Sequence, residues 1–541
     1  MSMENIFVIA AATGRTLVLP PPQIIYLLKK SSKGHGGINF DDFFPIYSEA
    51  FNKRVEVISS KEFFTKEMEK GGYLEIDDED MKKKLLELSE GCEKMQKDPK
   101  SCSIIDTFLQ NRGKHAQVSD SKHCLIFDEG AFKRGLSAIT SPPMMNSIKQ
   151  FCGEGREPLY YGSELAEPSI LHFQTSSEKW RILNHFYTTI YFTDPKIDNY
   201  YKRFVRDFIH YHENIFCAAG KIVKLLQEEG KERGFEVDDE GAGGFSALHI
   251  RRGDLQYKEV IISAEEWYNN TAKLWLDKEI LYIATDERNK AFFDPIAKHH
   301  DLRFLGDYFE KAGLEKLDPN WMGMVEIAVA ARGRMFAGTW HSTFSSYIMR
   351  LRGYYGLSKM TNYYSYRPRR FIMLKWKYPS GNYCAREFQS AWLGIDGDKY
   401  ILEDLEPNAP SPIGALADLS ELEESVPRPS HLARGVAGLP MSETPALVGA
   451  SRGTISCDIN VDSLAYWNDP QGTRDRDFVS PFRQSTTADK EQYMTFWQDA
   501  GRFNNIRMSL EILMVFAGKS CFVIRSIFIF CSSALKILAK P

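Results

Sequence analysis

The sequence predicts an α/β protein built around a parallel sheet. Between about residues 240 and 360, strand-like segments alternate with segments of helical length, and the strands read SALHI (246–250), EILYIATD (279–286), DLRFLGD (301–307) and MFAGTW (335–340). Strands that alternate with helices of that length indicate a parallel sheet covered by helices on both faces. We therefore expect a Rossmann-like domain in this part of the chain.

Composition and charge limit the class of protein. The 541 residues are 43% hydrophobic and 13% aromatic, enough to bury sizeable cores. Lysine and arginine (68) nearly balance aspartate and glutamate (72), for a net charge of -4, which argues against a bulk electrostatic binder of nucleic acid. The nine cysteines show no CxxC spacing, so neither a zinc ribbon nor a thioredoxin motif is indicated; disulfides in a secretory lumen and free thiols in cytosol both fit.

No targeting or transmembrane segment is expected. The first apolar stretch covers only residues 6–12 and has no basic region before it. The apolar C-terminal stretch, 509–541, is interrupted by Lys519, Arg525 and Lys536, and no run inside those limits is long enough to span a bilayer.

The remaining segments divide the chain further. Residues 2–12 read as a helix and 16–19 as a short buried strand. The charge-mixed region 65–123 reads as a solvated helical insertion, and 200–227 as one or two helices leading to the Rossmann-like unit. Pro, Ser and acidic residues without periodicity make 405–455 a flexible linker.

The first candidate site motif, HIRRGD (249–254), follows the SALHI strand. Open parallel sheets bind ligands just beyond the carboxyl ends of their strands. Arg251 and Arg252 offer planar, bidentate groups suited to a pyrophosphate. The alternative is an Arg–Asp ion pair that only fixes a loop. We expect both, with one arginine for the ligand and the other braced by Asp254.

Two other strand ends add to this site. Asp286 is able to accept from a ribose or a purine edge, or to cap the following helix, and taken alone capping is favoured. Ser342, Thr343 and Phe344 begin a helix whose N-terminus would form an anion cradle, although Ser342 could be only the cap. Three such strand ends indicate a nucleotide-diphosphate ligand. The P-loop and GxGxxG patterns are missing, which disfavours a P-loop NTPase or an NAD enzyme.

The two ends of the chain carry a repeat. Residues 2–10 align with 509–517, with the same polarity at every position but Asn5, as if one helix were written twice. Chance similarity of two short amphipathic helices is the alternative. The second copy follows DAGRFNN (499–505), a turn and helix start whose amide side chains could seat a sugar or phosphate.

In their order and spacing, HIRRGD, YIATDE and FAGTWHSTFSSYIMRLRGYYG resemble the GDP-fucose protein O-fucosyltransferase family and the related α1,6-fucosyltransferases. GRTLVLPP (14–21) and GRFNN (501–505) support the resemblance, which covers most of 1–370 and recurs in 456–517. It implies a GT-B fold, with two Rossmann-like domains facing a cleft, here followed by a flexible C-terminal extension. It also implies inverting, metal-independent transfer of fucose from GDP-fucose to a hydroxyl of a protein Ser/Thr or a glycan, with no cofactor and no nucleic-acid partner.

The resemblance assigns roles by position. Arg251 matches the arginine that holds the β-phosphate and stabilises the leaving GDP, the step at which a metal-free transferase needs electrostatic help. His249 and Asp286 match positions near the nucleoside, and Arg252 and Asp254 belong to the same donor loop. The segment that wraps the diphosphate is matched by Ser342, Thr343 and Phe344.

The N-terminal side of the cleft is matched only at the far end of the sequence. Asn504 and Asn505 match the Gly-Asn loop that closes on GDP, and Asp499 lies near where some members place a carboxylate base. We therefore assign 1–200 to an N-terminal, acceptor-side half without its first strand and loop, 201–404 to the GDP-sugar domain, 405–455 to a linker and 456–541 to a partial second copy.

Three explanations of the late position of the Gly-Asn loop remain open. The chain could be a gene model split from a tandem array, a true fragment, or a permuted arrangement in which 496–508 docks where the N-terminal half lacks its loop. We favour the first. The family implies the lumen of the endoplasmic reticulum or Golgi. The alternatives to a GDP-fucose enzyme are an inactive nucleotide- or carbohydrate-binding fragment and a transferase that uses another nucleotide sugar.

Overall fold

The computed structural model describes most of the chain up to residue 372 and shorter stretches beyond it. The described residues are 2–22, 40–94, 96–116, 123–136, 141–152, 156–173, 190–239, 241–253, 261–339, 342–357, 361–366, 369–372, 395–396, 457, 464–467, 475, 477–484 and 491–496. Asp254, Asp499, Asn504, Asn505, the linker 405–455 and the second copy of the repeat at 509–517 lie outside them.

The first sheet takes one of its inner strands from the far end of the chain. Its strand order is β2-β1-β14-β6-β3, and every neighbouring pair is parallel. Leu17 pairs with Met494 on one side of β14, and Leu171 pairs with Met494 on the other. The strands are β1 (Thr16–Leu19), β2 (Val57–Ser59), β3 (Lys114–Ala116), β6 (Ile170–Phe173) and β14 (Tyr493–Phe496).

Side chains alternate between the two faces of this sheet, as the period of a strand requires. Met494 faces the core formed with α1 (Ser2–Thr13) and α10 (Pro195–Phe208), while Tyr493 faces the core formed with α3 (Ser60–Glu67). Both faces of the sheet are therefore buried, which fits the mostly apolar residues of its inner strands β1, β14 and β6. Short helices α2 (Glu49–Asn52) and η1 (Phe40–Asp42) lie between β1 and β2 in the chain.

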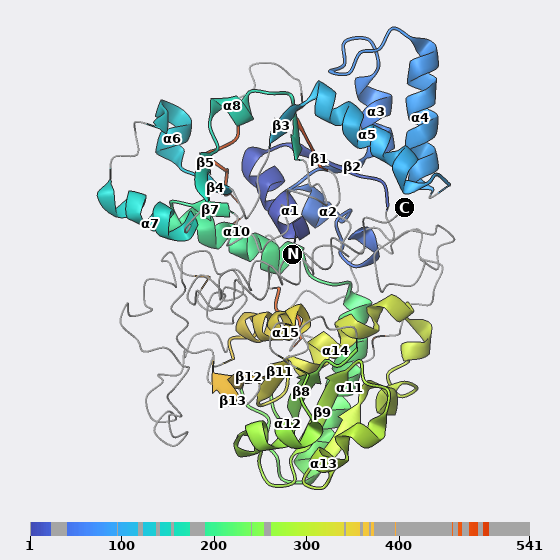
Figure 1. Cartoon of the computed structure of the whole chain (residues 1–541), viewed down its shortest axis with the longest axis vertical. Coiled ribbons are helices and arrows are strands. Elements are labelled where there is room, and N and C mark those ends of the chain that lie inside the picture. The colour runs from blue at the N-terminus through green and yellow to red at the C-terminus, as the bar shows by residue number, and fades with distance from the viewer. Residues whose placement is uncertain are drawn as a thin grey trace, which may run out of the picture.

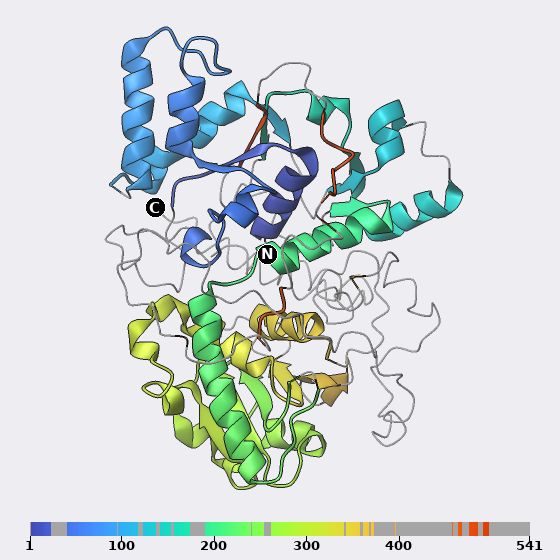
Figure 2. The ribbon, with the colours of Figure 1, turned by 180° about the vertical axis from the view of Figure 1, so that it is seen from behind.

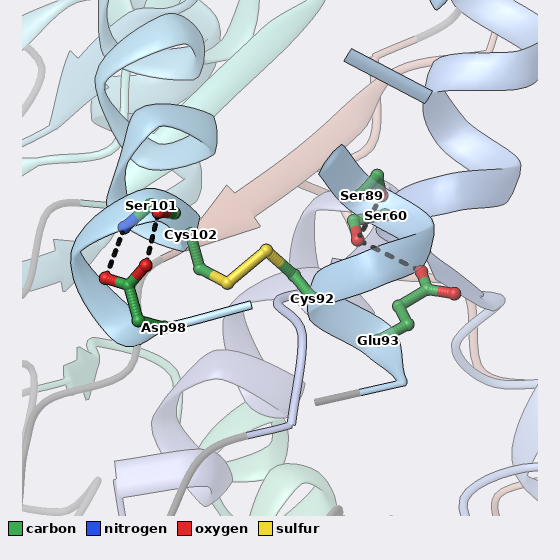
Figure 3. Close-up of a disulfide and its surroundings, with 7 residues drawn as sticks. All are labelled: Ser60, Ser89, Cys92, Glu93, Asp98, Ser101 and Cys102. Carbon is green, nitrogen blue, oxygen red and sulfur yellow. Dashed lines mark hydrogen bonds between the residues drawn. A yellow bond between two sulfur atoms is a disulfide. The ribbon is translucent and has the colours of Figure 1, made fainter. Parts of the chain in front are cut away.

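The charge-mixed region 65–123 packs more firmly than a solvated insertion would. Its helices α4 (Glu79–Glu93) and α5 (Pro99–Arg112) bury Leu85 and Leu109 in the same core as Tyr493. A disulfide between Cys92 and Cys102 joins the end of α4 to the start of α5, with the two Cα atoms 5.8 Å apart (Figure 3). One face of these helices is polar and the other is core, so the expectation of a solvated segment was only half right.

A second, smaller parallel sheet has the order β5-β4-β7. Its strands are β4 (His123–Phe127), β5 (Glu157–Tyr160) and β7 (Ile190–Phe192), and its helices are α6 (Glu129–Arg134), α7 (Pro142–Cys152) and α8 (Ser163–Ala166). A disulfide between Cys124 and Cys152 ties β4 to α7. Phe127 and Phe192 extend the core of the first sheet, so the two sheets share one hydrophobic cluster.

The third sheet is the one predicted most fully by the sequence. Its order is β10-β9-β8-β11-β12-β13, parallel except for the last pair. Its strands are β8 (Ser246–Ile250), β9 (Ile280–Thr285), β10 (Asp301–Phe304), β11 (Phe336–Thr339), β12 (Asn362–Tyr366) and β13 (Arg369–Ile372).

Helices cover both faces of this sheet. One face packs on α11 (Glu213–Glu232), α14 (Met322–Ala330) and α15 (Thr343–Tyr354), and the other on α12 (Ala264–Thr271) and α13 (Asp294–Ala297). The alternation of strands and helices predicted for 240–360 is confirmed. The helix expected after β9 is instead a 3-10 turn, η5 (Lys290–Phe293), followed by the short α13, which has a proline in its first turn.

The elements of the first two sheets form the upper half of the molecule in Figure 1, and the third sheet with its helices forms the lower half. The two halves meet where α1 and α15 approach each other. There Glu4 Oε2 lies 3.1 Å from a terminal guanidinium nitrogen of Arg350, and both side chains are buried. Among the described residues no helix is both long and apolar enough to span a membrane.

Candidate active site

Three neighbouring strand ends of the third sheet meet at one edge, because β8 lies between β9 and β11. Hydroxyl groups connect them. The Thr285 hydroxyl donates to the carbonyl of Ile250 at 2.6 Å, and the Arg251 backbone N–H donates to the Thr339 hydroxyl at 3.0 Å. The motifs that the sequence places after these strands therefore face the same space, where ligands of open parallel sheets bind.

The Asp286 carboxylate holds the loop that follows β8. One of its oxygens accepts from the backbone N–H of Arg252 at 2.7 Å and the other from that of Gly253 at 3.0 Å. A Cβ at position 253 would lie 2.7 Å from Asp286 Oδ2, so any larger residue there would force the Asp286 carboxylate to shift. Asp286 does not cap the next helical turn, whose N-cap is Asn289. The capping role favoured for Asp286 in isolation is thus wrong.

The two adjacent arginines have different surroundings. Arg252 Nε lies 2.8 Å from a Glu287 oxygen, and its guanidinium carbon lies 3.8 Å from the centre of the Phe292 ring. Glu287 and Phe292 therefore brace Arg252, and its expected partner Asp254 lies outside the described residues. Arg251 Nε is 3.9 Å from Asp286 Oδ2, and the Arg251 side chain is 23% exposed. Arg251 directly follows β8, so its side chain starts at the carboxyl end of that strand.

His249 is buried beneath this edge. Its Nδ1 lies 2.7 Å from the Ser345 hydroxyl, and its ring stacks on Phe344 with the two centres 4.4 Å apart. Burial, with a smaller effect from the neighbouring Arg251 charge, lowers the pKa of His249 to about 3. The ring is therefore neutral at physiological pH and fixes the position of Phe344 at the start of α15.

The N-terminus of α15 adds hydroxyl and backbone groups. Ser342 is the N-cap residue, yet its side chain makes no capping hydrogen bond, and its buried Oγ has no partner among the described residues. Thr343, the first residue of the helix, is exposed. The first N–H groups of a helix have no partners within it and lie at its positive end, where an anion is favoured. Ser342 and Thr343 thus lie where a phosphate could bind.

Glu326 was not singled out from the sequence. It is the one charged residue of α14 (MGMVEIAVA) and lies by the carboxyl end of β9, where it bonds to the Thr285 backbone and faces the Asp286 charge. Burial, mainly, and Asp286 to a lesser degree raise the pKa of Glu326 to about 8. The sequence did carry a signal for Glu326, because it is the one acidic residue in an otherwise apolar helix. A charged residue in such a helix is a candidate for a specific partner or a functional role.

Replacing Glu326 with glutamine is expected to flatten the pH dependence of stability. The folded-state pKa of about 8 exceeds the ordinary value of 4.5, so unfolding releases a proton between these values. The stability that the neutral acid contributes is complete below about pH 4.5 and is lost as the pH rises through 8, by roughly 1.4 kcal/mol per pH unit for one proton. Urea unfolding at several pH values checks this, and equal slopes for E326Q and the parent would contradict it.

Comparison with known proteins identifies the family to which this chain belongs. Within the part of the chain that the structure describes, no group of three or more His, Cys, Asp or Glu side chains is placed to hold a metal ion. No curated protein matches the chain. The family model of the GDP-fucose protein O-fucosyltransferases matches residues 1–355, well over half of the 541 residues. The match includes all three strand ends described above, and the chain belongs to the GDP-fucose protein O-fucosyltransferase family, whose members are glycosyltransferases that use GDP-fucose as donor.

Proposed function

We propose that this enzyme transfers fucose from GDP-fucose to a hydroxyl of a protein Ser/Thr or a glycan, with inversion and without a metal. The observation that carries the proposal is the position of Arg251. It follows the central strand β8, and the loop to which it belongs is fixed by both oxygens of Asp286.

Arg251 would stabilise the departing GDP. Its guanidinium donates to oxygens of the β-phosphate, where negative charge develops as the bond to fucose breaks. Ser342 and Thr343 at the positive end of α15 bind the same diphosphate. Asp286 lies on the side where the nucleoside would bind, and the buried His249 supports that side by stacking on Phe344 of the diphosphate segment. Arg252 supports the loop through Glu287, and Asp254 belongs to that loop.

We further propose that the fold is GT-B, with an acceptor-side domain over 1–200 and a GDP-sugar domain over 201–404. The first and third sheets, which have separate hydrophobic cores, support it. β14 runs parallel to β1 and ends at Phe496, and Asp499 follows three residues later in the sequence. Asp499 is our candidate base for the acceptor hydroxyl. Asn504 and Asn505 are our candidates for contacts to GDP from that side.

The site of action that we propose is the lumen of the endoplasmic reticulum or Golgi, where enzymes of this family are generally found. Three disulfides among the described residues support it: Cys92–Cys102, Cys124–Cys152 and Cys217–Cys457. Disulfides persist in such oxidising compartments and are rare in cytosol.

Donor competition and product analysis test this proposal. GDP is expected to compete with the donor at concentrations at least tenfold below those of UDP or ADP, and transfer is expected to continue in EDTA. NMR of the product should show the inverted anomeric configuration. Equal competition by UDP would point to another nucleotide sugar. GDP binding without transfer to protein or glycan acceptors would instead support an inactive binding protein.

A further inference from the structure

One segment near the C-terminus contacts elements of both halves of the fold. We call it the strap; it comprises the described residues between 457 and 496, namely 457, 464–467, 475, 477–484 and 491–496. It lies wholly beyond the residues that match the family model, 1–355. In Figure 2 its red-brown pieces lie beside the yellow helix α15 in the lower half and among the N-terminal elements in the upper half.

The strap begins with a covalent link to α11. Cys457 forms a disulfide with Cys217, a buried residue of that helix. Seven residues later, the Leu464 carbonyl accepts a hydrogen bond of 2.9 Å from the Tyr355 hydroxyl. The buried ring of Tyr466 lies 4.8 Å from that of Tyr354, and Trp467 stacks on His210 with the ring centres 4.1 Å apart. The first part of the strap thus covers the junction of α11 with the end of α15.

The middle of the strap is held by α10. Both oxygens of the Asp475 carboxylate accept from the Arg203 guanidinium, at 2.8 and 2.9 Å, and both side chains are largely buried. The Asp475 carbonyl also accepts from Arg54 at 3.0 Å. Phe478 stacks on Tyr200 of the same helix at 3.6 Å between ring centres. A bidentate, shielded ion pair of this kind requires a defined position of the chain.

Past α10 the strap enters the core of the first two sheets. The Ser480 hydroxyl donates to the carbonyl of Ala12 at the end of α1, at 2.5 Å. Phe482 is 1% exposed and lies 5.0 Å from Phe127 of β4 between ring centres. Removing these side chains would open the interior of the N-terminal half, because a buried aromatic ring fills volume that nothing else occupies.

The strap ends as β14, and its loss would split the first sheet. Neighbouring strands lie about 4.8 Å apart, so β1 and β6 would be left roughly 9.6 Å apart with unpaired backbone groups on both edges. Side chains also hold β14 in place. The Thr495 hydroxyl lies 2.8 Å from His172 Nδ1, the Tyr493 hydroxyl donates to Glu67 at 2.6 Å, and a guanidinium nitrogen of Arg15 donates to the Tyr493 carbonyl at 3.2 Å.

We propose that the strap is an integral part of this enzyme and that the chain is a cyclically permuted transferase. The occupant of the slot between β1 and β6 is the chain's own segment 491–496, locked to the body by the Cys217–Cys457 disulfide. Of the three explanations left open by the sequence, this is the permuted one. Four contact regions in sequence order, each buried against a different element, support it.

Cleavage within 405–455 of the full chain tests the proposal. A protease site is inserted there, the protein is cut, and the two fragments are followed by size-exclusion chromatography and thermal unfolding. The fragments are expected to co-elute as a 1:1 pair, with a melting temperature close to that of the uncut chain. Because a disulfide alone would keep them linked, the cut variant C217S/C457S is the stricter case, and it is also expected to co-elute.

Point variants in that disulfide-free background separate docking of β14 from any other association. Met494→Asp places a charge on a fully buried side chain of β14 and is expected to release the fragment, whereas Val479→Asp, at a strap position 72% exposed, should not. Release of the fragment without M494D would overturn the proposal, and so would co-elution that M494D leaves unchanged. Light scattering should show a monomer, and a dimer would mean that a second copy fills the slot. None of these readouts depends on fucose transfer.

Discussion

Replacing Arg251 with alanine is expected to lower kcat for fucose transfer by about 10²–10³-fold while the protein stays folded. A metal-free transferase must stabilise the leaving diphosphate with fixed donors, and Arg251 offers them at the carboxyl end of β8. The separation between Arg251 Nε and Asp286 Oδ2, 3.9 Å, is long for an ion pair and both side chains are partly exposed, so we expect the variant to stay folded. GDP affinity should fall by only about tenfold, since the ground state carries less charge at the broken bond.

Arg252→Ala is the matched control. It removes the same charge from the adjacent position, but Arg252 is engaged with Glu287 and with the face of Phe292. We expect a smaller loss of kcat and a lower melting temperature. Arg251→Lys should recover only part of the rate, because an ammonium group lacks the planar pair of donors. If R251A retains the parent kcat, or if R252A is the more damaging change to kcat, the assignment of Arg251 is wrong.

The third sheet and the clustering of its strand ends were readable from the sequence because both depend on local pattern. Strands of buried aliphatic residues alternate with helices over 240–360, and parallel neighbours bring the residues after β8, β9 and β11 to one edge. The side-chain contacts within the site were harder to predict from the sequence. Arg252 binds Glu287, which follows the next strand. The distance between the Arg252 and Glu287 side chains depends on how β8 and β9 pair, which local sequence does not show.

The position of β14 could not be predicted from local pattern. YMTF reads like any short apolar strand, and its contacts are with residues at the other end of the chain, such as Arg15, 478 positions away. The region 65–123 shows the same limit in a milder form. Its charges predict solvent exposure, yet Leu85 and Leu109 lie on one helical face each and complete a core with Tyr493. Pairing over such separations depends on tertiary packing, which periodicity does not record.

The buried ion pair between Glu4 and Arg350 gives the largest expected effect on stability. It joins α1 of the upper half to α15 of the lower half, and the Arg350 guanidinium also donates to the Tyr354 hydroxyl at 2.7 Å. Glu4→Met would leave the arginine charge buried without its carboxylate, at a cost of about 3–5 kcal/mol. Arg350→Met should cost a similar amount, because it leaves the carboxylate of Glu4 buried instead.

A double-mutant cycle separates the pair from its surroundings. The E4M/R350M protein replaces both charges with apolar side chains and is expected to be more stable than either single variant, with a coupling energy of about 2 kcal/mol. Urea unfolding followed by fluorescence measures each corner of the cycle. Since α1 and α15 belong to different sheets, both single variants should also separate the unfolding of the two halves into distinct transitions. Additive losses in the cycle, with one cooperative transition throughout, would show that Glu4 and Arg350 do not hold the halves together.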